Sequence, residues 1–211
     1  MRKYILTILS LITALPLCAQ GSAEKLLQKT VTKLEKDGGI SIKLDAQVRN
    51  EGSTDRIDME IKLSPDGSFY AMEDDNMMWF DGKTMWRGND FGDGIEEIYI
   101  TEPTPDEKIR FDIIGLLKKH QGFSVNGNGT DTFTLTASNP EHSVEGISKV
   151  TVTVDPSAYT IKTIQVEFDR ELGNITASAK VTEYKPGQKF DKATFTCPVK
   201  DYKDAEIVDL R

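Results

Sequence analysis

The chain has 211 residues, with 26 lysines and arginines against 34 aspartates and glutamates, so its formal net charge is −8. This acidic surplus repels phosphate, which argues against nucleic acid as a partner and against adhesion to an anionic membrane. The length suits a single domain.

The first nineteen residues have the pattern of a secretory signal peptide. Two basic residues precede a mostly apolar run that is too short to span a bilayer comfortably. Small residues predict cleavage after Ala19, which leaves residues 20–211 as one exported domain. Leu17 stands where a lipoprotein signal needs a small residue, so a lipid anchor at Cys18 is disfavoured. Once Cys18 is removed, Cys197 has no partner for an internal disulfide.

Residues 22–36 predict the first helix of the exported chain. Apolar residues recur there at helical spacing, Ser22 can cap the start, and a Gly-Gly pair ends the pattern. Over residues 40–63, apolar and polar residues alternate with a period of two, which is typical of half-buried strands. Short turns at residues 50–53 and 65–67 separate the strands, so the pattern predicts an antiparallel meander.

Residues 77–86 hold both tryptophans of the chain, on either side of Asp81-Gly82. An Asp-Gly pair between apolar runs predicts a hairpin, because the turn needs the positive φ that glycine adopts freely. Trp79 and Trp86 are therefore expected on paired strands, with three methionines beside them. Such a surface forms either ordinary core or the wall of a cavity for an apolar ligand of variable shape.

A second helical pattern, over about residues 107–120, interrupts the strands. The alternation then resumes and ends with a predicted strand at residues 193–196. A sheet of about ten strands must curl or close. The predicted fold class is therefore mainly β (α+β): a large curved antiparallel sheet, with an N-terminal helix and an internal helix that could cover its concave face as a lid.

Catalytic and metal-binding signatures are missing from the sequence. Cys197 is followed directly by a proline, and neither His120 nor His142 has the spacing of a catalytic triad or a metal site. The neighbouring carboxylates Glu96 and Glu97 would point to opposite faces of a strand. We therefore expect no enzyme, no cofactor and no metal, and a secreted hydrolase is the least favoured function.

Four stretches, in the same order, resemble the outer-membrane lipoprotein carrier family (LolA) of Gram-negative bacteria. The Asp-Gly-Lys-Thr-Met-Trp segment is similar to the family's Asp-Gly-Lys-Thr-Leu-Trp, and the second helix has its paired apolar residues. Together the stretches span nearly the whole exported chain. They are Ala23–Leu27, Asp81–Trp86, Phe111–Lys119, and Lys192–Pro198 with the acidic-aliphatic end at residues 207–209.

The resemblance implies an unclosed β-barrel with helices as a lid. It also implies a periplasmic carrier that takes lipoproteins from an inner-membrane ABC transporter to an outer-membrane receptor, and we expect a monomer. The family's Arg-Pro-x-x-Phe-x-Trp run appears only in part, because Phe69 matches while Ser64 stands in place of the arginine that helps to close the lid. A LolA-like lipid-binding domain or envelope sensor that ferries no cargo is therefore the alternative.

The acyl-binding cavity is expected to have a lining of large apolar residues from the hairpin region and from the lid helix. In an empty cavity the lid would pack against the same wall that acyl chains cover in the loaded state. The residues predicted for this site are Phe69, Trp79, Trp86, Ile113, Leu116 and Leu117.

Overall fold

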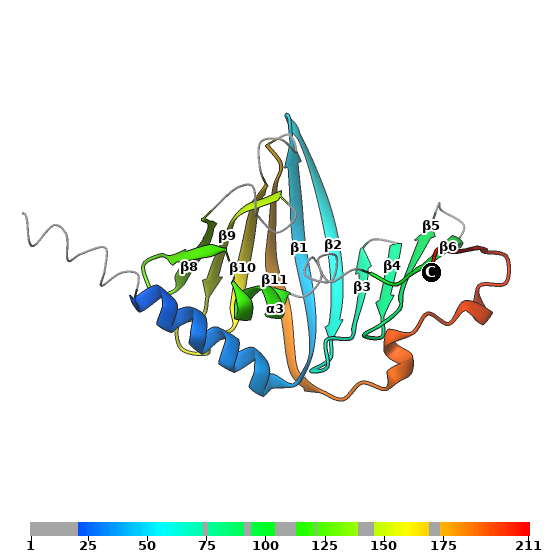
Figure 1. Ribbon diagram of the computed structural model, residues 1–211, viewed down its shortest axis with the longest axis horizontal. Helices are drawn as coiled ribbons and strands as arrows, with labels where there is room; N and C mark the ends of the chain where they lie inside the picture. Colours follow the sequence, from blue (N-terminus) through cyan, green and yellow to red (C-terminus); the bar gives the residue numbers. More distant parts are fainter. Residues whose placement is uncertain are drawn as a thin grey trace, which may run out of the picture.

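The computed structural model describes residues 21–73, 76–90, 94–103, 113–120, 122–138, 146–168 and 174–211. Its main feature is one curved sheet of twelve strands (Figure 1). The strands are β1 (Gly39–Asn50), β2 (Ser53–Leu63), β3 (Phe69–Glu73), β4 (Asn76–Phe80), β5 (Met85–Asp90), β6 (Ile95–Thr101), β7 (Phe123–Asn126), β8 (Thr132–Ala137), β9 (Ile147–Val154), β10 (Ile161–Phe168), β11 (Thr176–Gln188) and β12 (Glu206–Asp209).

The sheet is unclosed, with the order β12-β6-β5-β4-β3-β2-β1-β11-β10-β9-β8-β7. This arrangement confirms the predicted mainly β class and the large curved sheet. Strands β1 to β6 and β7 to β11 form two antiparallel meanders, which meet where β1 pairs with β11. The exception to the antiparallel pattern is β12, which runs parallel to β6 and was not predicted as a strand.

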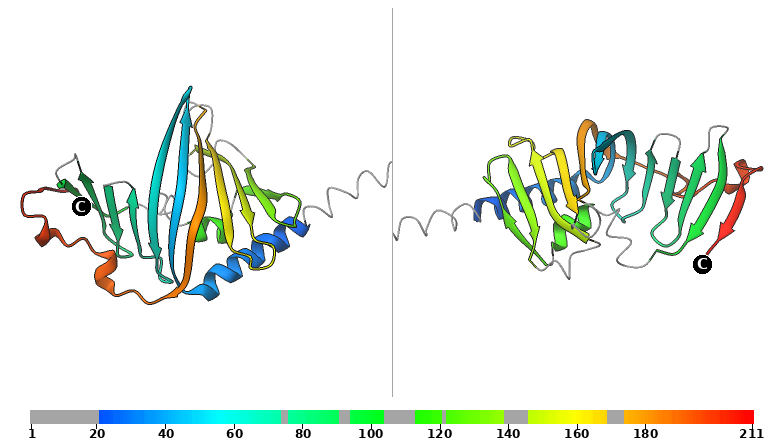
Figure 2. Two further views of the ribbon diagram at one scale, coloured as in Figure 1. Left: turned by 180° about the vertical axis from the view of Figure 1, so that it is seen from behind. Right: turned by 90° about the horizontal axis from the view of Figure 1, so that it is seen from above.

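Two helical segments lie on one face of the sheet, which we call the inner face (Figure 2). The N-terminal helix covers residues 21–37, as predicted, and α3 covers Ile113–Lys119. Part of the predicted second helix, residues 104–112, lies outside the described residues, as does the predicted signal peptide. Among the helices of the described ranges, none is both long and apolar enough to cross a bilayer.

The main hydrophobic core lies between these helices and strands β7–β10. Leu26 and Val31 of the N-terminal helix belong to one buried cluster with Phe133, Leu135 and Val152 of the sheet. Phe133, Leu135 and Val152 each have 0% exposure. Alternate residues of β8 and β9 on the other face are threonines and a lysine, so one face of these strands is core and the other is polar.

The C-terminal segment, residues 189–211, crosses the opposite or outer face of the sheet over β3–β6 (Figure 2). It contains two 3₁₀ turns, η4 (Lys192–Phe195) and η5 (Val199–Asp201), before it ends in β12. The predicted strand at residues 193–196 is therefore wrong. The Asp191 carboxylate accepts a hydrogen bond from the Ala193 N–H at 2.9 Å and caps the start of a helical turn instead.

Gly39 and Gln188 pair at the end of β1 and β11, where both covering segments leave the sheet (Figure 1). A Cβ atom at Gly39 would lie 2.2 Å from the carbonyl oxygen of Gln188. Real Cβ atoms do not come so close to backbone oxygens, so the pairing requires glycine at this position.

Candidate functional site

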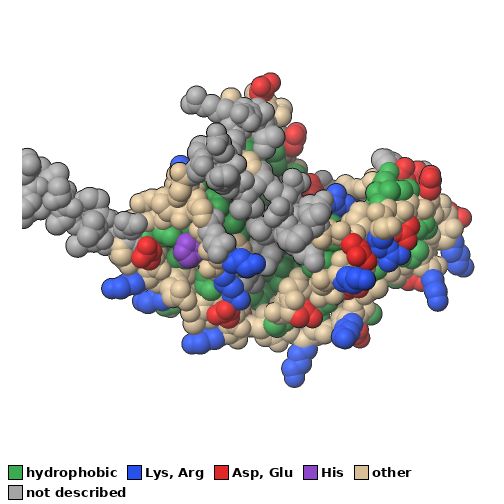
Figure 3. Space-filling model, viewed as in Figure 1, with side chains coloured by type: hydrophobic (Ala, Val, Ile, Leu, Met, Phe, Trp, Pro, Cys, Tyr) green, Lys and Arg blue, Asp and Glu red, His purple; other side chains and the backbone are tan. Residues whose placement is uncertain are grey.

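A cavity of about 510 Å³ opens on the inner face, beside the helix-covered core. Figure 3 looks onto this face, where hydrophobic side chains are visible near the middle and charged side chains follow the lower rim. Most of the lining is aliphatic and comes from the middle strands of the sheet. The apolar side chains that line it are Leu34, Ile42, Leu44, Ala46, Val48, Ile57, Met59, Ile61, Leu63, Phe69, Ala71, Met78, Ile161, Ile164, Val166, Ala177, Ala179 and Val181, with the ring of Tyr184.

The strand register explains why these residues form one continuous surface. Leu44 of β1 lies between Val181 of β11 and Met59 of β2. In the next row, Ile42 lies opposite Ile61, which in turn lies opposite Ala71 of β3. Because side chains alternate between faces, one register places the apolar residues of all these strands on the inner face.

These lining side chains differ from the core in their exposure. Leu44, Met59 and Ile61 are half-buried, whereas core residues such as Leu135 have 0% exposure. The described residues cover this contiguous apolar surface only in part, and proteins seldom leave such a surface exposed to water unless it binds something. The volume falls within the range of small-molecule pockets, about 300–1,000 Å³.

Polar side chains gather at the β3–β5 end of the cavity. Glu73 ends β3 and pairs with Asn76 of β4, while Arg87 of β5 pairs with Met78. Asn89 follows two residues later on the same face of β5. The cavity is therefore amphipathic, with an apolar floor and a polar end.

Tyr184 joins the cavity wall to the N-terminal helix. Its ring lines the cavity, and its hydroxyl donates a hydrogen bond of 2.6 Å to Asp37, which also forms an ion pair with Lys33. Burial and the hydrogen bond to Asp37 raise the pKa of the Tyr184 hydroxyl far above its ordinary value. The hydroxyl therefore stays neutral and serves to position the helix. In the described ranges, no three His, Cys, Asp or Glu side chains are grouped so as to hold a metal ion.

The structure does not bring the six predicted site residues together. Phe69 lines the cavity. Leu116 and Leu117 of α3 are buried in the core with the N-terminal helix, and the Ile113 side chain lies outside the described part of the chain. Trp79 and Trp86 belong to a separate cluster on the outer face. Whether any of the six contacts an acyl chain stays a prediction.

The tryptophans pair across the hairpin, as predicted, and pack under the C-terminal segment. The Trp79 ring centroid lies 5.8 Å from that of Tyr70 and 6.3 Å from that of Tyr202. Burial raises the pKa of the neighbouring Cys197 thiol to about 12, so this thiol is a packing group.

The unbroken apolar run of β4 is the sequence signal for this arrangement. A half-buried strand alternates, whereas a strand that is buried on both faces does not. Met78 and Phe80 of β4 face inward and Trp79 faces outward, so both faces carry large apolar groups. Residues 77–86 were predicted to form either ordinary core or the wall of a cavity, and the structure instead covers β4 with apolar groups on both faces.

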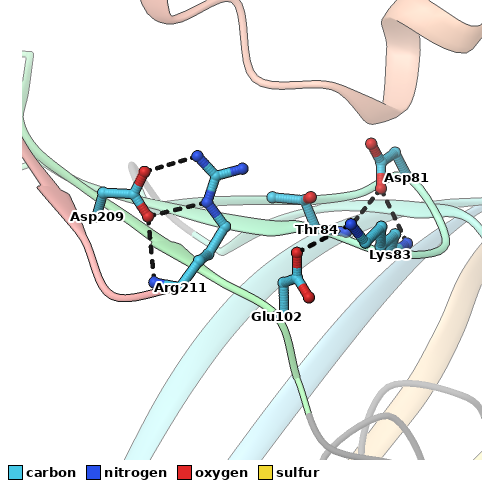
Figure 4. Close-up of polar contacts among 6 residues, drawn as sticks. All are labelled: Asp81, Lys83, Thr84, Glu102, Asp209 and Arg211. Atoms are coloured by element: carbon cyan, nitrogen blue, oxygen red, sulfur yellow. Dashed lines mark hydrogen bonds and ion pairs between the residues drawn. The ribbon is translucent and has the colours of Figure 1, made fainter.

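Polar contacts secure the end of this hairpin (Figure 4). The Asp81 carboxylate accepts hydrogen bonds from the N–H groups of Lys83 at 2.9 Å and Thr84 at 2.8 Å. The Lys83 ammonium forms an ion pair of 3.1 Å with Glu102, just beyond β6. These bonds hold β4, β5 and β6 in register at the turn end of the hairpin, where Phe80 pairs with Met85, and not at the end that carries Asn76 and Asn89.

A family model described as outer membrane lipoprotein carrier protein LolA matches residues 17–170 of the chain. No curated protein matches it. The fold is similar to that of an uncharacterized conserved protein from Thermus thermophilus. The two chains are 14% identical with a TM-score of 0.53, and the match covers 86% of this chain and 98% of that one.

Two further solved structures are similar at lower scores. A putative outer membrane lipoprotein-sorting protein domain from Vibrio parahaemolyticus is 10% identical, with a TM-score of 0.47, over 88% of this chain and 99% of that one. A LolA superfamily protein from Nitrosomonas europaea is 11% identical, with a TM-score of 0.42, over 83% and 98% of the two chains.

Proposed function

This chain belongs to the family of LolA outer membrane lipoprotein carrier proteins, and from that premise we propose that it binds lipoprotein acyl chains in the cavity of the inner face and carries them across the periplasm. In this proposal an inner-membrane ABC transporter supplies the cargo and an outer-membrane receptor accepts it. The chain is exported by its first nineteen residues and works as a monomer without a cofactor.

The observation that supports this proposal best is the half-exposed aliphatic surface of β1, β2, β10 and β11. Acyl chains are flexible and featureless, so they need a broad apolar surface more than directional contacts. Leu44, Met59 and Ile164 offer that surface. Methionine adapts its shape at low cost, which suits cargo of variable length.

The partial exposure of the cavity also suits release. Burial of an acyl chain contributes about 0.8 kcal/mol per CH₂ group. Three fully buried chains would therefore contribute on the order of tens of kcal/mol, beyond the ceiling of about 18–21 kcal/mol for non-covalent affinity. A carrier with an open cavity buries only part of each chain, so the cargo can still leave.

The first test is whether the protein carries acyl lipid. We expect native mass spectrometry of the protein isolated from the periplasm of a Gram-negative host to show adducts with acyl lipid. Leu44→Glu places a charge on the apolar floor and should abolish them. Thr163→Glu makes the same change in charge on the exposed outer face of β10 and should leave them intact.

A protein that contains no lipid and binds no fluorescent acyl probe would refute the proposal. A transfer assay between inner and outer membranes then separates a carrier from the alternative. Lipid binding without transfer would assign the chain to the lipid-binding or envelope-sensing class instead.

A further inference from the structure

The volume of the cavity corresponds to one long acyl chain. It is about 510 Å³. A CH₂ group takes up about as much space as a water molecule does in the liquid, about 30 Å³, so the cavity accommodates about 17 such groups. Three chains of that length would need about 1,500 Å³. The volume therefore limits the cargo more narrowly than the apolar character of the lining does.

The middle of the cavity floor is hollowed by small side chains. Ala46 and Ala179 pair across β1 and β11, which lie at the centre of the sheet (Figure 1). Ile57 on β2 and Ile164 on β10 flank this pair in the same row. Ala177 extends the hollow along β11, because residues two apart share a face of a strand. A methyl side chain leaves open the space that a larger aliphatic side chain would fill, so the row has room between its two isoleucines.

The rows on either side of the hollow are aliphatic as well. Val48 lies opposite Ala177 on one side, and Leu44 lies opposite Val181 on the other. Leu44, Val48 and Val181 are half-buried. A hydrocarbon chain in the hollow therefore lies against hydrocarbon along these rows and covers no polar side chain there, so its burial carries no cost from an unpaired polar group.

We propose that the cavity holds a single acyl chain of about 16–18 carbons, seated over the alanine hollow formed by Ala46, Ala177 and Ala179. A cargo with several chains has one chain in the cavity and the others outside it. The proposal rests on the proposed acyl-binding function and adds the number and the length of the bound chains to it.

The first experiment measures how affinity depends on chain length in the wild-type protein. Saturated fatty acids from decanoic to docosanoic acid are titrated separately, below their solubility limits, by displacement of a fluorescent acyl probe. Each added CH₂ group should tighten binding by up to about fourfold until the chain has about 16–18 carbons, and longer chains should bind no more tightly. Titration calorimetry with hexadecanoic acid should give one bound molecule per protein.

The second experiment changes the depth of the alanine hollow. Ala179→Leu adds three carbon atoms, about 90 Å³ by the same measure, so the affinity should level off at a chain about three carbons shorter. Thr163→Leu is the matched control, because it introduces the same side chain at an exposed position on the outer face of β10. It should leave the dependence on chain length unchanged. Thermal unfolding verifies that both variants are folded.

The outcomes separate the single-chain inference from the function on which it rests. Affinity that still rises at docosanoic acid, or more than one bound hexadecanoic acid per protein, would overturn the single-chain inference but leave the acyl-binding function standing. A dependence on chain length that Ala179→Leu does not shift would overturn the placement of the chain over the alanine hollow. Failure of every fatty acid to bind would refute the acyl-binding function itself.

Discussion

Strands β7–β10 and strands β3–β6 are covered on opposite faces of the same sheet. In β7–β10 the N-terminal helix and α3 cover the inner face, and the outer face is polar. In β3–β6 the C-terminal segment covers the outer face, where Trp79 and Trp86 are buried. Between these two regions, the inner face of β1–β5, together with β11 and part of β10, lines the cavity.

This difference distinguishes the side chains that stabilise the fold from the side chains of the proposed binding surface. Side chains such as Phe133 and Val152 have no contact with solvent. Their burial therefore stabilises the fold without any ligand. Leu44 and Met59 carry the same kind of apolar surface but remain partly exposed. The closed half therefore supplies much of the folding free energy, and the open half leaves part of its apolar surface exposed, as the proposed acyl-binding function requires.

The largest expected effect comes from the same substitution made in each half. Leu135→Ala should lower the free energy of unfolding by about 3–5 kcal/mol, because it leaves a cavity in a packed core. Leu44→Ala should lower it by about 1 kcal/mol or less, because the removed atoms already face a cavity. Urea denaturation of the lipid-free protein measures both values. Similar losses at the two positions would contradict the division into a closed and an open half.

An intermediate effect is expected at the outer cluster. Trp86→Phe should lower the free energy of unfolding by about 1–2 kcal/mol, because the smaller ring fills less of the space under the C-terminal segment. Binding of a fluorescent acyl probe should stay unchanged, because the residue faces away from the cavity. Phe69→Glu, on the inner face, is the control that should lose binding. A Trp86 variant that folds but loses the probe would place acyl chains on the outer face.

The smallest effect concerns Cys197 in a Cys18→Ser background. Its folded pKa of about 12 lies above the ordinary value of about 8.5 for an unfolded thiol. The thiol therefore contributes stability that is complete below about pH 8.5 and is lost as the pH rises toward 12. Unfolding measured at neutral pH and at about pH 10 should reveal this loss, and Cys197→Ala should remove the contribution. Rapid reaction of the folded protein with a thiol reagent at neutral pH would contradict the buried placement.

Local patterns were sufficient to predict most of the sheet. The alternation in residues 40–63 predicted β1 and β2, and the Asp-Gly pair predicted the β4–β5 hairpin. The helix near residue 22 was also correct. These features depend on neighbours in the chain, where side-chain period and turn chemistry decide the structure.

What could not be predicted depends on contacts between distant segments. The alternation of apolar and polar residues indicates that one face of a strand is apolar, but it does not indicate which segment covers that face. The outward direction of Trp79 and Trp86 was therefore not predicted. The Ala-Thr-Phe-Thr segment favours a strand by composition, yet the Asp191 cap converts it into a 3₁₀ turn. The parallel pairing of β12 with β6 joins residues about a hundred positions apart and leaves no local signature.

The pairing of Gly39 with Gln188 has a mechanical consequence. The helix that covers one half of the sheet leads into β1 at this pair, and the segment that covers the other half leaves β11 at the same place. Each cover is also held by its own packing, the helix in the main core and the segment through β12 and the tryptophan cluster. A bulky residue at position 39 would push β1 and β11 apart and so disturb the junctions of both covers at once.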